Sequence, residues 1–173
     1  AQSIAAEASR ADVVRQVETG ERLLRYLHHV KTAEVVTLND GHQDVRLSGL
    51  NGAFDPLYYD LADGPERPAE SLAYFVRADV EKCLRLPPVD IFLAHGCPAG
   101  LGYGREPDYS VAALRDILDV VQPRVMFCGH AHFFREVHTT TSTIYSLNQL
   151  KEEYYIFDTQ DGTLERFPSR SLL

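Results

Sequence analysis

Residues 89–98 read VDIFLAHGCP, and residues 124–132 read RVMFCGHAH. Each stretch opens with a short apolar run, 89–94 in the first and 124–128 in the second, as is typical of a strand buried on both faces. A histidine and a glycine follow directly in both. In open α/β sheets, ligands bind at the carboxyl ends of the strands. If the two strands are parallel neighbours, these stretches place a functional site at one edge of a sheet.

Helical periodicity surrounds the two strands. Residues 68–84 carry an apolar face, formed by Leu72, Phe75, Val76, Val80 and Leu84. Residues 109–121 carry another, formed by Leu114, Ile117, Leu118 and Val121. The order helix, strand, loop, helix, strand predicts a parallel pair with a right-handed crossover.

The outer parts of the chain have weaker patterns. Residues 3–29 are expected to be helical, and residues 34–38 and 44–50 to form two strands. After residue 132, short strands are expected at 133–139, 143–147, 154–158 and 163–167, arranged as an antiparallel meander. The prediction is one domain, residues 1–173, of the α/β (α+β) class.

Composition narrows the function classes. The chain has 173 residues, of which 45% are hydrophobic and 24% charged, which suits a globular domain. A formal charge of -8 argues against a broad nucleic-acid surface. No apolar run is long enough to span a bilayer. Three cysteines, Cys83, Cys97 and Cys128, show no framework spacing, so a reducing cytoplasm is expected.

The candidate metal ligands are His95, His130 and His132. Imidazole is a common metal ligand, and Gly96 and Gly129 permit close backbone approach. In an extended backbone, residues i and i+2 point to the same side, so His130 and His132 are expected to reach the same small volume. The alternative for a histidine at a strand end is a hydrogen-bonded structural role, which is the interpretation for His28, His29 and His138.

The two stretches resemble a known family. Residues 91–98 resemble the fourth conserved block of the calcineurin-like metallophosphoesterases, an apolar strand running into His-Gly-Pro-Pro. Residues 129–132 resemble the fifth, Gly-His-x-His. The resemblance spans residues 33–167 and is specific between 89 and 132. It implies half of a four-layer α/β/β/α sandwich with mixed sheets.

The resemblance also implies a chemistry. Two divalent ions (Mn, Fe, Zn or Ni) would clamp a phosphate ester and acidify a water that attacks phosphorus. His95 and His130 would bind one ion and His132 the other. The substrate would be a phosphomonoester or a phosphodiester.

The chain departs from the family at three earlier blocks, Asp-x-His, Gly-Asp-x-x-Asp and Gly-Asn-His-Asp/Glu. Neither Gly-Asp nor Asn-His occurs in it. The expectation is therefore a C-terminal half, whose acidic ligands and proton donor come from an N-terminal half or partner polypeptide. Residues 35–42 superficially copy the first block, with Asp40 and His42 as ligands, but an Asp-Gly hairpin turn is the favoured interpretation.

Several neighbouring residues have open roles. Cys97, which stands where the family has proline, and Cys128 are either extra soft ligands or small apolar fillers, and filler is favoured. Asn51, Tyr103 and Arg105 lie in loops that face the expected substrate. Arg105 is the candidate phosphate contact because its planar fork matches phosphate oxygens, against the alternative of a solvated loop charge.

Two hypotheses follow. The first is a metallophosphoesterase, a hydrolase that acts when joined to its missing half. The second is a non-catalytic or regulatory half-domain that has lost the Asp and Asn ligands, either with a single zinc ion or without metal.

Overall fold

The computed structural model describes residues 29–39, 41–102 and 110–169. The chain divides into residues 1–31 and residues 32–173, and every described helix and strand belongs to the second unit. The helix expected over residues 3–29 lies almost wholly outside the described residues.

Ten strands and two α-helices make up the described part. The strands are β1 (Val36–Asn39), β2 (Asp44–Leu50), β3 (Ile91–Ala94), β4 (Cys97–Pro98), β5 (Ser110–Val111), β6 (Val125–Cys128), β7 (Arg135–His138), β8 (Thr143–Ser146), β9 (Glu153–Phe157) and β10 (Leu164–Pro168). The helices are α2 (Arg77–Cys83) and α3 (Ala112–Val121). A 3₁₀ turn at Ala69–Ala73 precedes α2.

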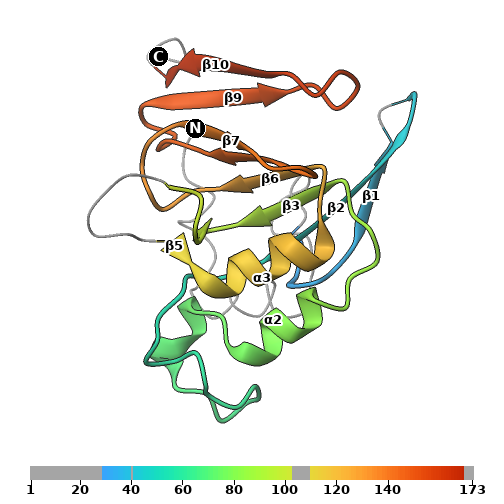
Figure 1. The fold of residues 1–173 in the computed structure, drawn as a ribbon. Helices are drawn as coiled ribbons and strands as arrows, with labels where there is room; N and C mark the ends of the chain where they lie inside the picture. Colours follow the sequence, from blue (N-terminus) through green and yellow to red (C-terminus); the bar gives the residue numbers. More distant parts are fainter. Residues whose placement is uncertain (1–28, 40, 103–109, 170–173) are drawn as a thin grey trace, which may run out of the picture. The chain divides into compact units, whose positions relative to one another are not determined.

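A six-stranded mixed sheet in the order β1-β2-β3-β6-β8-β7 organises the fold (Figure 1). The four central strands β2, β3, β6 and β8 are parallel, and β1 and β7 run antiparallel at the two ends. Two small sheets, β9–β10 and β4–β5, accompany it. The predicted α/β (α+β) class and the parallel pairing of β3 with β6 are confirmed.

The core lies between the sheet and the two helices, which cover the same face (Figure 1). Phe92, Met126 and Ile144, from three adjacent parallel strands, have no exposed surface, and neither do Leu114 and Ile117 on α3. Burying a side chain of this size stabilises the fold by about 1.5–3 kcal/mol. This layer therefore fixes how the parallel strands align.

The opposite face of the sheet carries aromatic residues. Phe127 stacks on Tyr145 with ring centroids 5.6 Å apart, and Phe157 of β9 meets Phe127 edge-on at 5.3 Å. Nearer β2, Leu93 on the same face is 37% exposed. The β9 strand thus packs against one part of this face and leaves an apolar side chain partly exposed in another.

The single helix predicted over residues 68–84 is wrong. The chain forms the 3₁₀ turn, then extended backbone at Tyr74, and only then α2. The backbone of Ala73 and Phe75 bonds to Ala53 in the loop after β2, with N–H to O distances of 2.9 and 3.1 Å. Leu72, placed on the buried face by periodicity, is 59% exposed. The hydrogen bonds of the loop override the helical pattern.

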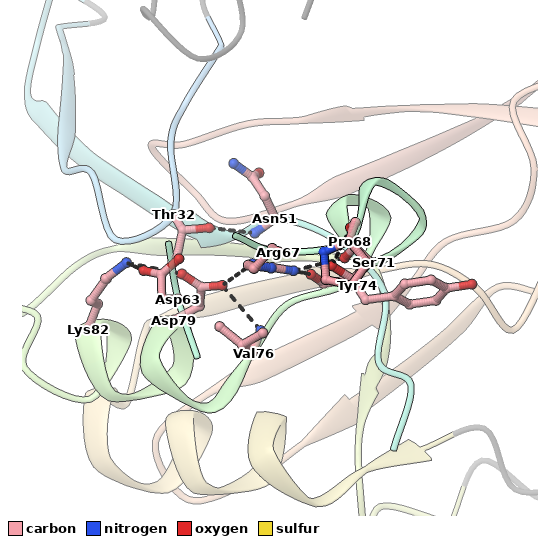
Figure 2. A network of polar contacts seen from close by, with 10 residues as sticks. All are labelled: Thr32, Asn51, Asp63, Arg67, Pro68, Ser71, Tyr74, Val76, Asp79 and Lys82. Atoms are coloured by element: carbon pink, nitrogen blue, oxygen red, sulfur yellow. Dashed lines mark hydrogen bonds and ion pairs between the residues drawn. The ribbon is translucent and has the colours of Figure 1, made fainter. Parts of the chain in front are cut away.

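Arg67, whose side chain is 10% exposed, holds this interruption in place, as Figure 2 shows. Arg67 Nη2 donates to the carbonyl oxygens of Ser71 and Tyr74 at 2.8 and 2.7 Å. Asp79, 3.9 Å from Arg67 Nη1, accepts the Val76 N–H at 3.2 Å. These contacts tie the 3₁₀ turn to the first turn of α2.

The antiparallel meander predicted after residue 132 is wrong at its centre. The β8 strand pairs antiparallel with β7 but parallel with β6. The β7–β8 hairpin turns at residues 139–142, where the Thr139 hydroxyl oxygen accepts the Ser142 N–H at 3.0 Å. Because β7 is the edge strand, β8 lies between β7 and β6. The meander is thereby interrupted, since β9 pairs with β10 in a separate sheet. The β9–β10 hairpin is antiparallel, as expected.

The predicted hairpin at residues 34–50 is observed, with Asn39 opposite Asp44. Among the described residues, no helix combines the length and apolar character needed to cross a bilayer.

Candidate metal centre

The register of the parallel strands brings their carboxyl ends together. Leu50, Ala94, Cys128 and Ser146 are aligned across β2, β3, β6 and β8. The residues that follow each strand therefore leave the sheet at the same edge, here called the carboxyl edge. They are Asn51, His95, Gly129 and Leu147.

His95 and His130 are in direct contact at this edge. His95 Nε2 lies 3.0 Å from His130 Nδ1, with the ring centroids 5.0 Å apart. Without metal, one of these nitrogens donates a hydrogen bond to the other. Two nitrogens that bind one metal ion at about 2.0–2.1 Å are separated by about 2.8–3.4 Å when the angle at the metal is roughly 90–110°. The observed spacing therefore fits a shared ion.

The protonation of His95 favours metal binding. Partial desolvation of its ring lowers the pKa of His95 from the ordinary 6.5, and repulsion from His130 and His132 lowers this pKa further. The neutral imidazole, which is the form that binds metal, is therefore favoured near neutral pH.

His132 makes a different contact. Its Nδ1 lies 2.7 Å from Gln149 Nε2. If that amide donates, the neutral ring carries its proton on Nε2. If the amide is rotated so that its oxygen accepts from Nδ1–H, Nε2 is left open for a metal. Gln149 therefore sets the tautomer of His132.

The expectation that His130 and His132 lie in extended backbone is wrong. Both adopt left-handed backbone, with φ of 64° and 56°. The Gly129 N–H donates to the His95 carbonyl at 3.0 Å, and the Ala131 N–H donates to the Gly129 carbonyl at 2.7 Å. The positions of the two imidazole rings are therefore determined by this tight turn and not by the alternation of side chains along a strand.

The two glycines have different neighbours, and only Gly129 lies against backbone. A Cβ on Gly96 would approach Val111 and Leu114 to 3.2 and 3.3 Å, and one on Gly129 would approach the His95 carbonyl oxygen to 3.4 Å. The turn that carries His130 therefore packs closely on the backbone of His95.

Two hollows flank the histidine pair. A pocket of about 240 Å³ is lined by His95, His130 and loop residues such as Ala53 and Phe54. A wider groove of about 490 Å³ is lined by His130, His132 and the segment after β8, with an apolar floor that includes Leu93 and Phe127. The histidines lie at the junction of the two hollows.

The remaining predicted residues fall in different places. Asn51 lies at the carboxyl edge, and its backbone N–H donates to Thr32 Oγ1 at 3.1 Å (Figure 2). Arg105 and Tyr103 lie outside the described residues. His42 lies within the β1–β2 turn at the opposite edge, which agrees with the hairpin interpretation.

Sequence reasoning missed Asn148 and Gln149. Both follow β8 and line the groove beside His132. The interpretation of residues 143–147 as part of a meander concealed their place at the carboxyl edge. One sequence feature could have revealed them. Residues 143–147 are followed by polar side chains able to bind ligands, as are the two strands that end before His95 and Gly129.

Cys97 and Cys128 are both buried beside the histidines, 3% and 2% exposed. This burial agrees with the interpretation of both as apolar fillers. Across residues 29–39, 41–102 and 110–169, no cluster of three or more His, Cys, Asp or Glu side chains has the geometry to hold a metal ion. The structure thus joins two of the three predicted ligands and leaves His132 apart from them.

The described elements define a mixed α/β chain with a histidine pair at the carboxyl edge of its parallel strands. No protein-family model matches the chain, and the search of curated proteins found no match.

Two solved structures are similar in fold. TT1561 of Thermus thermophilus matches with a TM-score of 0.53 and 16% identity, over 80% of this chain and 58% of that one. A second solved structure matches with a TM-score of 0.54 and 11% identity, over 80% of this chain and 53% of the other. The chain therefore spans little more than half the length of the structures it resembles.

Proposed function

We propose that this chain supplies part of the active site of a metal-dependent phosphoesterase, which hydrolyses a phosphomonoester or phosphodiester. The observation that carries the proposal is the 3.0 Å contact between His95 Nε2 and His130 Nδ1 at the carboxyl edge. Its support from sequence is the resemblance of residues 89–98 and 129–132 to two blocks of the calcineurin-like metallophosphoesterases.

Each residue of the proposed site has a separate role. His95 and His130 hold one divalent ion, and His132, oriented by Gln149, holds a second. When bound, the ions (Mn, Fe, Zn or Ni) supply Lewis acidity and lower the pKa of a bound water. Asn51, at the same edge, and Arg105 are the proposed contacts to the phosphate ester. The pocket of about 240 Å³ beside the histidine pair gives that ester room to approach.

The proposed site is completed by other residues. Two supports point to a second polypeptide or a preceding segment of a longer chain that supplies Asp, Asn and His ligands. One is the greater length of the structures that share the fold. The other is Leu93, an apolar side chain beside the groove that is 37% exposed and that a second sheet of a four-layer sandwich would cover.

The test is to isolate the tagged chain from its own cells with whatever remains bound to it. Metal content is then measured by mass spectrometry, and hydrolysis of p-nitrophenyl phosphate and of bis(p-nitrophenyl) phosphate is followed. Two ions per complex together with hydrolysis support the proposal. One zinc ion without hydrolysis favours the alternative, a non-catalytic half-domain. An isolated complex free of metal and without hydrolysis contradicts the proposal and likewise supports the non-catalytic half-domain.

A further inference from the structure

A pair of thiols lies directly beneath the histidine turn. The Cys128 thiol donates to Cys97 Sγ at 3.1 Å. A disulfide has an S–S length of about 2.05 Å, so the sulfurs need to approach by only about 1 Å. Cys97 belongs to β4 and Cys128 to β6, and the hydrogen bond from Gly129 N–H to the His95 carbonyl joins the segments that carry them.

Both thiols are buried, and the Cys128 side chain lies on the core face of β6 together with Met126, on the side opposite Phe127. Cys128 helps to line the groove of about 490 Å³, next to Phe127 and His130. The two residues are almost equally buried, at 2% exposed for Cys128 and 3% for Cys97, so a small neutral oxidant reaches either sulfur through brief local openings of the structure.

The third cysteine is a natural control. Cys83 has no exposed surface, and its thiol donates to the Gly49 carbonyl at 3.8 Å. Burial raises the pKa of Cys83 to about 12, so its reactive thiolate is scarce. Cys83 is therefore expected to resist oxidants that modify the other two.

We propose that Cys97 and Cys128 form a redox-sensitive dithiol, which hydrogen peroxide converts to a disulfide beneath the His95–His130 pair. In the first step the Cys128 sulfur attacks the O–O bond, forming a sulfenic acid and releasing water. In the second step the Cys97 sulfur attacks the sulfenic sulfur and releases a second water. Two thiols lose two electrons and two protons, and one peroxide is reduced to two waters.

The disulfide changes the histidine turn. In the reduced form, the Cys97 thiol donates to the Gly129 carbonyl at 3.3 Å. Oxidation removes that proton and draws the Cys128 backbone toward Cys97. Gly129 connects Cys128 to His130, whose φ of 64° depends on the local turn. The contact between His95 and His130 is therefore altered, whether or not a metal binds there.

The test uses the whole chain without added metal. After treatment with hydrogen peroxide, thiols are blocked, and the chain is digested with trypsin and analysed by mass spectrometry. The expected product is a crosslink between the tryptic peptides 86–105 and 125–135, lighter by two hydrogens, with Cys83 still alkylated. Dithiothreitol should reverse it, and the imidazole proton resonances of His95 and His130 should shift between the two forms.

Three variants sharpen the result. Cys83→Ser should form the crosslink like the unaltered chain. Cys97→Ser and Cys128→Ser should lose it, and circular dichroism establishes that they remain folded. Alkylation of all three thiols after peroxide treatment of the unaltered chain would overturn the inference, as would a crosslink through Cys83. A crosslink that leaves the His95 and His130 resonances unmoved would overturn the proposed effect on the turn. None of these results depends on phosphoesterase activity.

Discussion

The two edges of the central sheet both carry histidines, but they hold them differently. At the amino edge, His138 lies 3.0 Å from Glu136 and 3.1 Å from Thr143, within its own hairpin. At the carboxyl edge, His95 contacts His130, which belongs to a different strand connection. Strand direction therefore decides whether a histidine meets a neighbour from its own hairpin or a ligand-type side chain from a distant segment.

The largest effect should come from the core that aligns both edges. Phe92 is fully buried in β3 against α3, so Phe92→Ala should reduce the free energy of unfolding by about 3–5 kcal/mol. Urea denaturation measures the loss. Val120→Ala, at a position 61% exposed on α3, is the control and should change stability by at most about 0.5 kcal/mol. Equal losses in the two variants would show that the layer between sheet and helices does not set the fold.

The next largest effect should be on metal affinity, and it should differ between histidines at the two edges. His130→Ala should weaken Zn²⁺ binding by more than about 100-fold, since even partners outside the ligand set typically contribute 10–100-fold. His138→Ala, at the amino edge, should leave the affinity unchanged. Isothermal titration calorimetry at constant pH makes the comparison, and similar affinities for both variants would rule out the metal centre at the carboxyl edge.

A smaller effect should come from the residue that orients His132. Gln149→Leu removes the partner 2.7 Å from His132 Nδ1 and should weaken metal binding by about 10–100-fold. Gln149→Glu keeps an acceptor for the ring N–H and should bind metal more tightly than the leucine variant. The matched control is Gln43→Leu, because Gln43 donates to the Thr159 carbonyl at 2.8 Å away from the carboxyl edge. A Gln43 variant as impaired as the Gln149 variant would point to a general loss of structure.

The smallest effect should be a pH dependence of stability in the metal-free chain. The pKa of His95 is lowered in the folded state by burial and by its neighbouring histidines, so the unfolded chain takes up the proton first. Stability should therefore be full above the ordinary pKa of 6.5, should decline as pH falls below it, and should stop declining once pH lies below the folded pKa. Urea denaturation from pH 8 to pH 5 should show a shallower decline in His95→Gln, and identical profiles would contradict the assignment.

The sequence predicted those features that depend on local patterns. Apolar runs located β3 and β6, and the glycine-histidine endings located the carboxyl edge. Competing hydrogen bonds caused the errors. Arg67 and Ala53 interrupt the helix expected around Leu72, and no periodicity reports a bond from a distant loop. The left-handed backbone of His130 likewise arises from the contact between Gly129 and His95, which exists only after folding.

The strand pairing after residue 132 was predicted wrongly for a similar reason. Short strands after residue 132 were located, but their partners were not, because the pairing of β8 with β6 depends on which strand takes the outer position. Gln149 could not be recognised at the site without that pairing. Position in the sheet, unlike strand propensity, is a property of the whole chain.

The parallel register also bears on how quickly the protein folds. The pairs Leu47–Ile91 and Ile91–Val125 each close a long loop, and no hairpin can form them. Domains rich in such non-local pairs fold slowly, because loop entropy is lost before the contacts form. The β1–β2 and β9–β10 hairpins can form early. The contact between His95 and His130 can form only after β3 has paired with β6. A newly made chain therefore acquires its hairpins before its His95–His130 pair comes together.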